Sequence, residues 1–281
     1  MFIKKLNKHH LISHLFLIVI GIIMIYPLIW LFFAAFKDNI EIHSGINLLP
    51  KQFNPSGFIK GWKWAGNFTF GYFIINTFKL VLPTVIATVA SSTLVAYGFA
   101  RFSFPFKRIL FIIMISTMML PNAVIIIPRY ILFNKFGWLN TYKPFYIPQL
   151  FAFAAFFNFM LIQFFRGIPK ELDESALIDG CGSFVILTRI LLPLCVPAIL
   201  SVALFQFMWT WNDFFNSLIY INSVAKYPVS IALSMGLDNE ALVEWNKILA
   251  MSFVGILPPA ILFFLMQKYF VEGISTSGVK G

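Results

Sequence analysis

Charged side chains are scarce in this chain. They make up 11% of its 281 residues, whereas hydrophobic residues make up 59% and 35 residues are phenylalanine. Soluble globular domains carry about 25% charged and about 45–50% apolar residues. The composition therefore excludes an ordinary soluble domain and indicates an integral membrane protein.

Cysteine and histidine are also sparse. The two cysteines, Cys181 and Cys195, are too few for a disulfide framework. The four histidines, at positions 9, 10, 14 and 43, do not show the spacing of metal ligands. We therefore expect no structural disulfide and no metal site.

A phosphate-binding loop is missing as well. The pattern Gly-x4-Gly-Lys-Ser/Thr occurs nowhere in the chain, so the chain cannot bind ATP in the manner of P-loop proteins. The net charge is +10, but the cations are scattered over loops and form no basic cluster interleaved with aromatic residues. We expect neither a bound cofactor nor a nucleic-acid partner.

Long apolar runs are what the sequence has instead. A helix needs about 20 mainly apolar residues to cross a lipid bilayer. Six runs qualify, over residues 11–36, 74–100, 109–128, 145–165, 194–221 and 248–266. They predict an all-α membrane domain over residues 11–267, preceded by a segment 1–10 and followed by a tail 268–281.

One polar segment, residues 168–193, interrupts these runs. Pro169 suits a first helical turn, and Glu171, Asp173 and Glu174 place negative charge at the positive end of the helix dipole. Asp179-Gly180 can supply a left-handed residue that ends this helix. Ser183 can cap a second short helix that ends at Pro193. The segment therefore predicts a helix, a tight turn and a second helix in water.

The same segment carries a family pattern. Glu174-Ser175-Ala176 is followed after three residues by Gly180, and after nine more by Ile190-Leu191-Leu192-Pro193. This resembles the EAA loop of ABC importer permeases, with Ser175 as the one departure. In that family the loop is a coupling loop that fits a cleft on a cytoplasmic ATPase. The resemblance implies that role for Glu174, Ser175, Ala176, Leu177, Asp179, Gly180, Ile190 and Pro193.

Further stretches resemble the carbohydrate branch of this family, and in particular the smaller, second permease of maltose-type importers. They are Thr117-Met-Met-Leu-Pro121, the stretch from Ile127-Pro128 to Asn140-Thr141-Tyr142, Trp211-Asn-Asp213, and Gly273 to Gly281. The implied fold is the type I ABC importer permease fold. The implied partners are a second homologous permease, two cytoplasmic ATPase subunits that hold ATP and Mg, and an extracytoplasmic solute-binding protein.

The resemblance also gives a role to the glycine-rich tail. In the second permease of such importers, a tail of this kind reaches the ATPase dimer interface, which implies ATPase contacts for Ser277, Gly278 and Lys280. By its composition the tail is too flexible to fold alone, so a frayed terminus is the alternative.

Orientation follows mainly from the polar segment. Lys4, Lys5 and Lys8, and a short loop with Arg101, Lys107 and Arg108, should face the cytoplasm. Loops on the other side also carry lysines and arginines, so the polar segment, which must meet a cytoplasmic partner, decides. We expect both termini in the cytoplasm of a bacterium, and the chain in its cytoplasmic membrane.

Amide side chains within the apolar runs are candidates for a translocation path. Asn158, Gln206 and Asn212 are such candidates because polar groups at membrane depth usually face a cavity or another helix. Hydrogen bonding between helices is the alternative. We expect Asp213, near the outer interface, to cap a helix or bond between helices.

These observations predict one half of the translocation path of an ATP-driven carbohydrate importer, with an oligosaccharide as the first candidate cargo. A secondary transporter would show inverted repeats or paired intramembrane charges. A membrane-embedded enzyme would need a catalytic constellation within the runs, and Asp213 alone does not make one.

Overall fold

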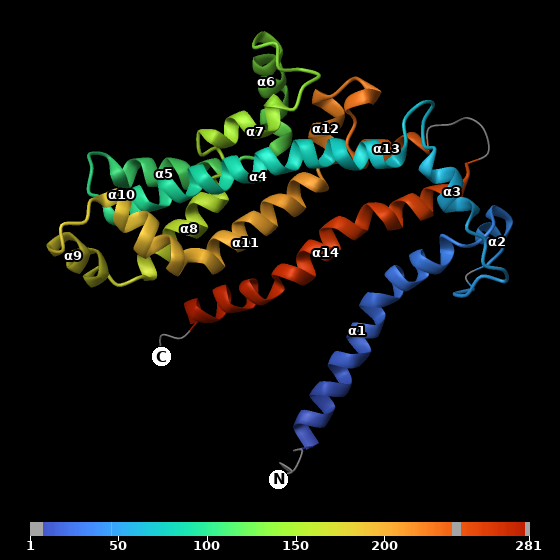
Figure 1. Cartoon of the computed structure of the whole chain (residues 1–281), viewed down its shortest axis with the longest axis horizontal. Coiled ribbons are helices and arrows are strands. Elements are labelled where there is room, and N and C mark those ends of the chain that lie inside the picture. Colours follow the sequence, from blue (N-terminus) through green and yellow to red (C-terminus); the bar gives the residue numbers. More distant parts are fainter. Residues whose placement is uncertain (1–7, 46, 238–242, 279–281) are drawn as a thin grey trace. The chain divides into compact units, whose positions relative to one another are not determined.

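The computed structural model describes residues 8–45, 47–237 and 243–278. These residues form helices joined by loops, and no strand occurs among them (Figure 1). The all-α class is therefore confirmed. The chain divides into two compact units, one of residues 1–71 and 233–256 and the other of residues 72–232 and 257–281.

The first unit joins the N-terminal helices to the start of the last helix. It contains α1 (Lys8–Ala34), α2 (Asn39–Ser44), α3 (Ser56–Trp62) and residues 245–256 of α14 (Trp245–Gly278). Gly57 packs so closely that a Cβ there would lie 2.6 Å from the carbonyl oxygen of Asn246. Phe32 and Phe253 meet edge to face with ring centroids 5.2 Å apart. Along α1 most large apolar side chains are exposed, as suits a helix whose solvent is lipid.

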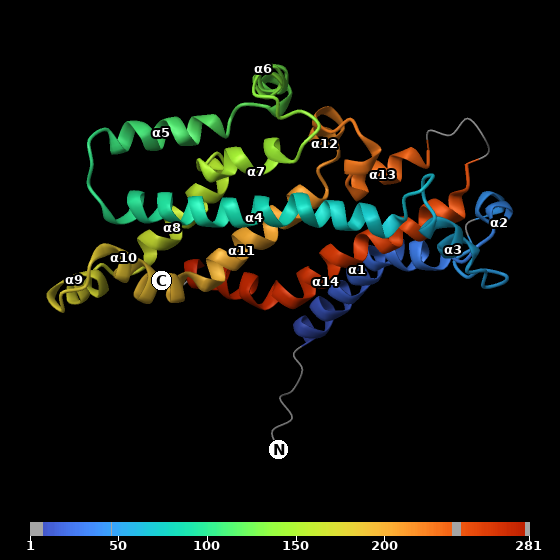
Figure 2. The same cartoon turned by 45° about the horizontal axis from the view of Figure 1, so that its top comes forward.

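The second unit holds the other elements. They are α4 (Phe70–Arg101), α5 (Lys107–Thr117), α6 (Asn122–Lys135), α7 (Lys143–Leu150), α8 (Ala155–Gly167), α9 (Glu171–Ile178), α10 (Ser183–Val185), the π-helical turn η1 (Ile186–Leu191), α11 (Leu192–Trp211), α12 (Phe214–Tyr220), the 3-10 turn η2 (Val224–Lys226) and α13 (Val229–Met235). After a short turn, α5 returns along α4 (Figure 2). One hydrophobic core lies between α4, α8, α9 and α11 and includes Phe157, Leu161, Phe165, Leu191 and Val202.

Five helical stretches are long and apolar enough to cross a membrane. They are Ser13–Ala34, Phe70–Arg101, Lys143–Gly167, Ser183–Trp211 and Trp245–Lys268. The sixth apolar run is a pair of helices, α5 and α6, bent by 102°. The predicted third span, 109–128, falls on this bent pair. Pro121 stands in extended backbone just before α6 and supplies no N–H, so the helix of α5 cannot continue through it.

The fifth run also differs from its prediction. The helix begins at Ser183 rather than 194 and ends at Trp211 rather than 221. A helix end was expected at Pro193, but Pro193 lies in the first turn of α11. The wider turn η1 before it accommodates the missing N–H. Gly182, not Ser183, occupies the N-cap of α10.

At the other end of α11 the chain turns and starts a new helix. Asp213 is the N-cap of α12, and its carboxylate accepts a hydrogen bond of 3.1 Å from the backbone N–H of Asn216. The expectation that Asp213 caps a helix is confirmed. The cap explains why the apolar run 194–221 is divided.

Asn140 fixes the loop between α6 and α7. Its φ of 56° is left-handed, a conformation that asparagine tolerates. Its side-chain carbonyl accepts from the backbone N–H of Ser223 at 3.0 Å, and its amide donates to the Ser223 hydroxyl at 2.7 Å. Its backbone N–H donates to the carbonyl of Tyr220 at 2.7 Å. This loop is therefore tied to the end of α12.

The tail is more regular than expected. Helix α14 continues to Gly278, so residues 268–278 extend a helix instead of forming a segment without structure of its own. Ser277 and Gly278 lie in its last turn. Lys280, like Lys4 and Lys5, lies outside the described residues.

Candidate functional site: the polar segment and a cavity

The first half of the polar segment is a helix closed by a glycine. Helix α9 begins at Glu171, two residues after Pro169, and Gly180 follows it with a φ of 80°. The N–H of Cys181 donates to the carbonyl of Ala176 at 2.9 Å, and that of Gly180 to Leu177 at 3.0 Å. This pair of bonds is a Schellman motif, which needs a left-handed residue at its turn. The predicted helix end at Gly180 is confirmed.

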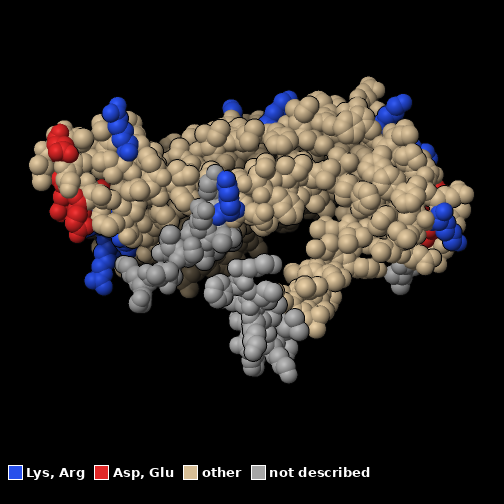
Figure 3. Space-filling view, turned by 60° about the horizontal axis from the view of Figure 1, so that its bottom comes forward, with Lys and Arg blue, Asp and Glu red and all other residues tan. Residues whose placement is uncertain are grey.

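The tip of the segment is exposed and has both charge and apolar surface. Of the predicted coupling residues, Glu174, Ser175, Leu177, Asp179 and Gly180 are all exposed. Beside them stand two large side chains that sequence reasoning missed, Ile178 at 87% exposure and Phe184 at 73%. Acidic side chains gather at this end of the molecule (Figure 3). Apolar side chains that remain exposed in a polar surrounding are typical of a protein contact.

Three predicted coupling residues have other positions. Ala176 is only 5% exposed and belongs to the core cluster, so its small side chain lets α9 approach the core and is not part of the exposed tip. Ile190 is half-buried against the same core. Pro193 is exposed, but on the first turn of α11. Ala176 therefore contacts the core of its own unit and does not stand on the exposed tip.

The segment is anchored to the end of α4. Arg101 pairs with Asp173 of α9, and the two side chains are 7% and 14% exposed. The Arg101 guanidinium also donates to the carbonyl of Ile168 at 3.0 Å. Tyr97, one turn earlier, donates its hydroxyl hydrogen to the carbonyl of Ser183 at 2.9 Å. Sequence reasoning missed both anchors, although a single arginine at the end of a long apolar helix was a visible signal.

The second half of the segment is continuous with a long helix. Elements α10, η1 and α11 follow one another without a break and form the stretch Ser183–Trp211, 29 residues long. Two helices therefore connect the exposed tip with the apolar part of the second unit. One is α4 through Arg101 and Tyr97, and the other is α11 through the helix itself.

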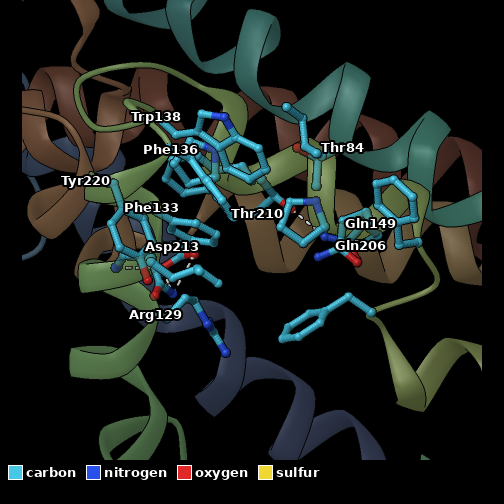
Figure 4. A pocket seen from close by; sticks show the side chains of 18 residues that line it. Thr84, Arg129, Phe133, Phe136, Trp138, Gln149, Gln206, Thr210, Asp213 and Tyr220 are labelled. Atoms are coloured by element: carbon cyan, nitrogen blue, oxygen red, sulfur yellow. Dashed lines mark hydrogen bonds between the residues drawn. The ribbon is translucent and has the colours of Figure 1, made fainter.

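A cavity of about 350 Å³ lies in the second unit, away from this segment. It is lined by aromatic and polar side chains from α4, α6, α7, α11, α12 and the loops between them: Thr84, Arg129, Phe133, Phe136, Trp138, Phe145, Gln149, Phe151, Phe153, Gln206, Thr210, Asp213, Asn216 and Tyr220, together with Leu132, Pro144, Ile147 and Pro148 (Figure 4). A second cavity of about 490 Å³ has a purely apolar lining from α4, α11 and α14.

Of the three residues predicted to line a translocation path, one lines the cavity and two do not. Gln206 lines the mixed cavity, where its amide donates to the hydroxyl of Thr210 at 2.6 Å. Asn158 is buried and donates to the carbonyl of Ala152 at 2.7 Å, a residue with a left-handed φ of 57°. Asn212 is exposed and bonds the carbonyl of Met208 in its own helix at 2.8 Å. Asn158 and Asn212 thus bond neighbouring backbone, and neither lines the cavity.

The lining of the cavity includes one cationic side chain, Arg129, and one anionic side chain, Asp213. The Arg129 guanidinium lies 5.1 Å from the ring centre of Phe153. The Asp213 carboxylate accepts two hydrogen bonds from the side-chain amide of Asn216, at 3.0 and 2.9 Å. Burial raises the pKa of Asp213, and the bonds from Asn216 and the charge of Arg129 offset part of that rise. Among the described residues, no three His, Cys, Asp or Glu side chains gather as metal ligands.

The long apolar helices define a class, the multi-span helical membrane proteins. Residues 91–276 match the family described as "Binding-protein-dependent transport system inner membrane component". The chain therefore belongs to this family, whose members are permease subunits of ABC importers, and it is a multi-pass protein of the inner membrane.

Two relatives and one solved structure show the extent of the similarity. The chain is 33% identical over 267 residues to the probable ABC transporter permease protein YurM of Bacillus subtilis, covering 95% of this chain and 87% of that protein. It is 29% identical over 266 residues to the trehalose/maltose transport system permease protein MalG of Thermococcus litoralis, covering 94% of each. A bacterial ABC transporter involved in the import of the acidic polysaccharide alginate contains a chain of the same fold, with a TM-score of 0.81, 20% identity and coverage of 96% of this chain and 99% of that one.

Proposed function

We propose that this chain is a permease subunit of an ATP-driven importer for a carbohydrate. The observation that carries the proposal is the exposed tip of the polar segment, with its left-handed Gly180 and apolar Ile178, held by a buried ion pair. A tip that is rigidly held and apolar suits the cleft of a partner protein. The carbohydrate class is supported by the similarity to MalG and by the aromatic and polar lining of the cavity.

In this proposal the partner is a cytoplasmic ATPase. Two ATPase subunits bind ATP and Mg, and this chain performs no covalent chemistry. A second homologous permease completes the translocation path, and an extracytoplasmic binding protein delivers the substrate. The polar segment and both termini then lie in the cytoplasm, and the membrane is that of a bacterium.

The anchors explain how closure of the ATPases can reach the membrane. A displacement of the tip acts on α4 through Arg101 and Tyr97, and on α11 through the continuous helix. Packed helices switch between discrete arrangements more readily than they deform. The two helices then move together from an inward-open to an outward-open arrangement. The last turn of α14, with Ser277 and Gly278, and Lys280 beyond it, is a second proposed contact with the ATPases.

The coupling role is tested by replacing Gly180 with Asp. The left-handed φ is less favourable for Asp than for Gly, and the added carboxylate places a charge at the tip, where no described atom lies within 4 Å of a new Cβ. We expect the variant complex to assemble in vesicles but to lose substrate-stimulated ATP hydrolysis and uptake.

Gly182 provides the matched control. It is exposed, has a φ of −74° and precedes α10, where Asp is a favourable N-cap. Gly182→Asp adds the same charge without backbone strain, so most of the activity should remain. Normal uptake by Gly180→Asp would show that this tip does not couple the two subunits.

A further inference from the structure

The mixed cavity of the second unit has an aromatic wall and a polar wall. Phe133 and Trp138 stack with ring centroids 5.5 Å apart, and Phe133 meets Tyr220 edge to face at 5.3 Å. Arg129 and Asp213 lie on the side of Tyr220 and Phe133, and Gln149, Gln206 and Thr210 lie opposite (Figure 4). A ligand with apolar faces and polar edges would meet both walls.

Two buried amide oxygen atoms belong to residues that line this cavity and lack a partner. No described residue donates a hydrogen bond to Oε1 of Gln149 or to Oδ1 of Asn216, although both atoms are shielded from solvent. A buried acceptor without a donor is costly, at roughly 1–3 kcal/mol. Both atoms can only accept hydrogen bonds, so the groups that satisfy them must be donors, such as hydroxyls.

The charges of the lining indicate the net charge of a suitable ligand. Arg129 and Asp213 are the charged residues of the lining, and their charges sum to zero. An anionic ligand would meet the Asp213 carboxylate as well as the Arg129 guanidinium. A neutral ligand faces no such opposition.

We propose that this cavity binds a neutral glycosyl unit of the transported carbohydrate. Its hydroxyls donate to Gln149 and Asn216 once these two side chains turn toward the ligand, and its apolar face lies on the aromatic wall. The cavity is at the small end of the range of about 300–1,000 Å³ for small-molecule sites, so it holds a short segment of the sugar rather than a long chain. This inference rests on the proposed function and adds a site and a charge class to it.

Thiol protection in the complete importer tests the site. Cys181 and Cys195 are replaced with Ala, and Phe153→Cys places a reactive thiol on the lining at a position that is 56% exposed. Leu150→Cys is the control, since it is also 56% exposed but is not part of the lining. Vesicles are supplied with maltotriose, diacetylchitobiose, arabinotriose or an alginate trisaccharide. We expect the neutral sugar that the vesicles take up to slow thiol labelling of the Phe153→Cys variant and to leave labelling of the Leu150→Cys variant unchanged.

A second pair of variants tests the chemistry. Gln149→Met removes one acceptor at similar length and should raise the KM for uptake about five-fold, the worth of one hydrogen bond. Leu150→Met is its matched neighbour and should not change KM. Asp213→Asn keeps a good N-cap for α12 but gives the cavity a net positive charge. It should improve uptake of the acidic trisaccharide relative to the neutral sugar roughly ten-fold.

The results of these uptake and labelling experiments distinguish a failure of the proposed sugar site from a failure of the proposed import function. If no carbohydrate is taken up in an ATP-dependent manner, the proposed function fails. If a neutral sugar is taken up but neither protects the thiol of the Phe153→Cys variant nor responds to Gln149→Met, the cavity is not its site. If only the acidic trisaccharide is taken up or protects, the assignment of a neutral ligand is wrong.

Discussion

The buried pair of Arg101 and Asp173 makes a quantitative prediction about the polar segment. The side chains are 7% and 14% exposed, so solvent screens their attraction little. Removing one partner of such a pair leaves a buried charge without compensation and typically costs about 3–5 kcal/mol. Replacing both with apolar residues of similar size is often close to neutral. The single variants Arg101→Met and Asp173→Leu should therefore each be far more damaging than the double variant.

Local opening of α9 gives a direct measurement. Lys170 is exposed immediately before α9, and trypsin can cut after it once the segment opens. A loss of about 3 kcal/mol raises the open population, and with it the cleavage rate, roughly 100-fold. The full chain in lipid nanodiscs is digested briefly, and cleavage between Lys170 and Glu171 is followed by mass spectrometry. The double variant should be cut less than about ten times faster than the natural protein.

Arg108→Met is the control for charge, because Arg108 belongs to the same short region but is exposed. It should leave the cleavage rate unchanged within about two-fold. Additive effects of the two single variants would refute the reasoning, because independent residues do not compensate for each other. Equal rates in all variants would show that α9 is held by its core contacts alone.

Two further predictions concern Asn140, in the loop between α6 and α7, and Asp213, at the start of α12. Asn140→Ala removes the hydrogen bonds to Ser223 and puts alanine at a left-handed φ, so we expect it to destabilise the fold by about 2–3 kcal/mol. Asn140→Gly also removes these bonds but tolerates the φ angle, so it should destabilise the fold less. Thermal unfolding followed by tryptophan fluorescence measures both losses, and equal losses would contradict the role of the φ angle. Because burial raises the pKa of Asp213, the folded state binds its proton more tightly than the unfolded state, so stability should fall as the pH rises from the ordinary value of 3.8 through the raised pKa. Asp213→Asn should flatten that decline, and an unchanged pH profile would show that Asp213 does not titrate in this way.

The sequence predicted the helical class and the position of the polar segment well, for a simple reason. Apolar runs report which residues can face lipid, and the glycine of a Schellman motif reports a left-handed turn. Both are local properties. The bend at Pro121 and the cap at Asp213 were also visible as residue types, but their effect on the helices depended on whether the chain continued or turned there.

The site residues were predicted less evenly. Gly180 and Leu177 stand on the exposed tip, whereas Ala176 faces the core, because the side of a short helix that is buried depends on the elements beneath it. Asn158, Gln206 and Asn212 look alike in the sequence, yet only Gln206 lines the cavity. Spacing along the chain does not tell which helix lies opposite an amide.

The sequence by itself determined that this is a helical membrane protein that lacks the P-loop pattern and carries one polar segment between its apolar runs. Only the tertiary structure decided that Arg101 at the end of α4 meets Asp173 of α9, and that Gln149, Asp213 and Asn216 line one cavity. Residues far apart in the chain are brought together by helix packing, which local composition does not encode. The buried pair and the neutral cavity exist for that reason only in the folded chain.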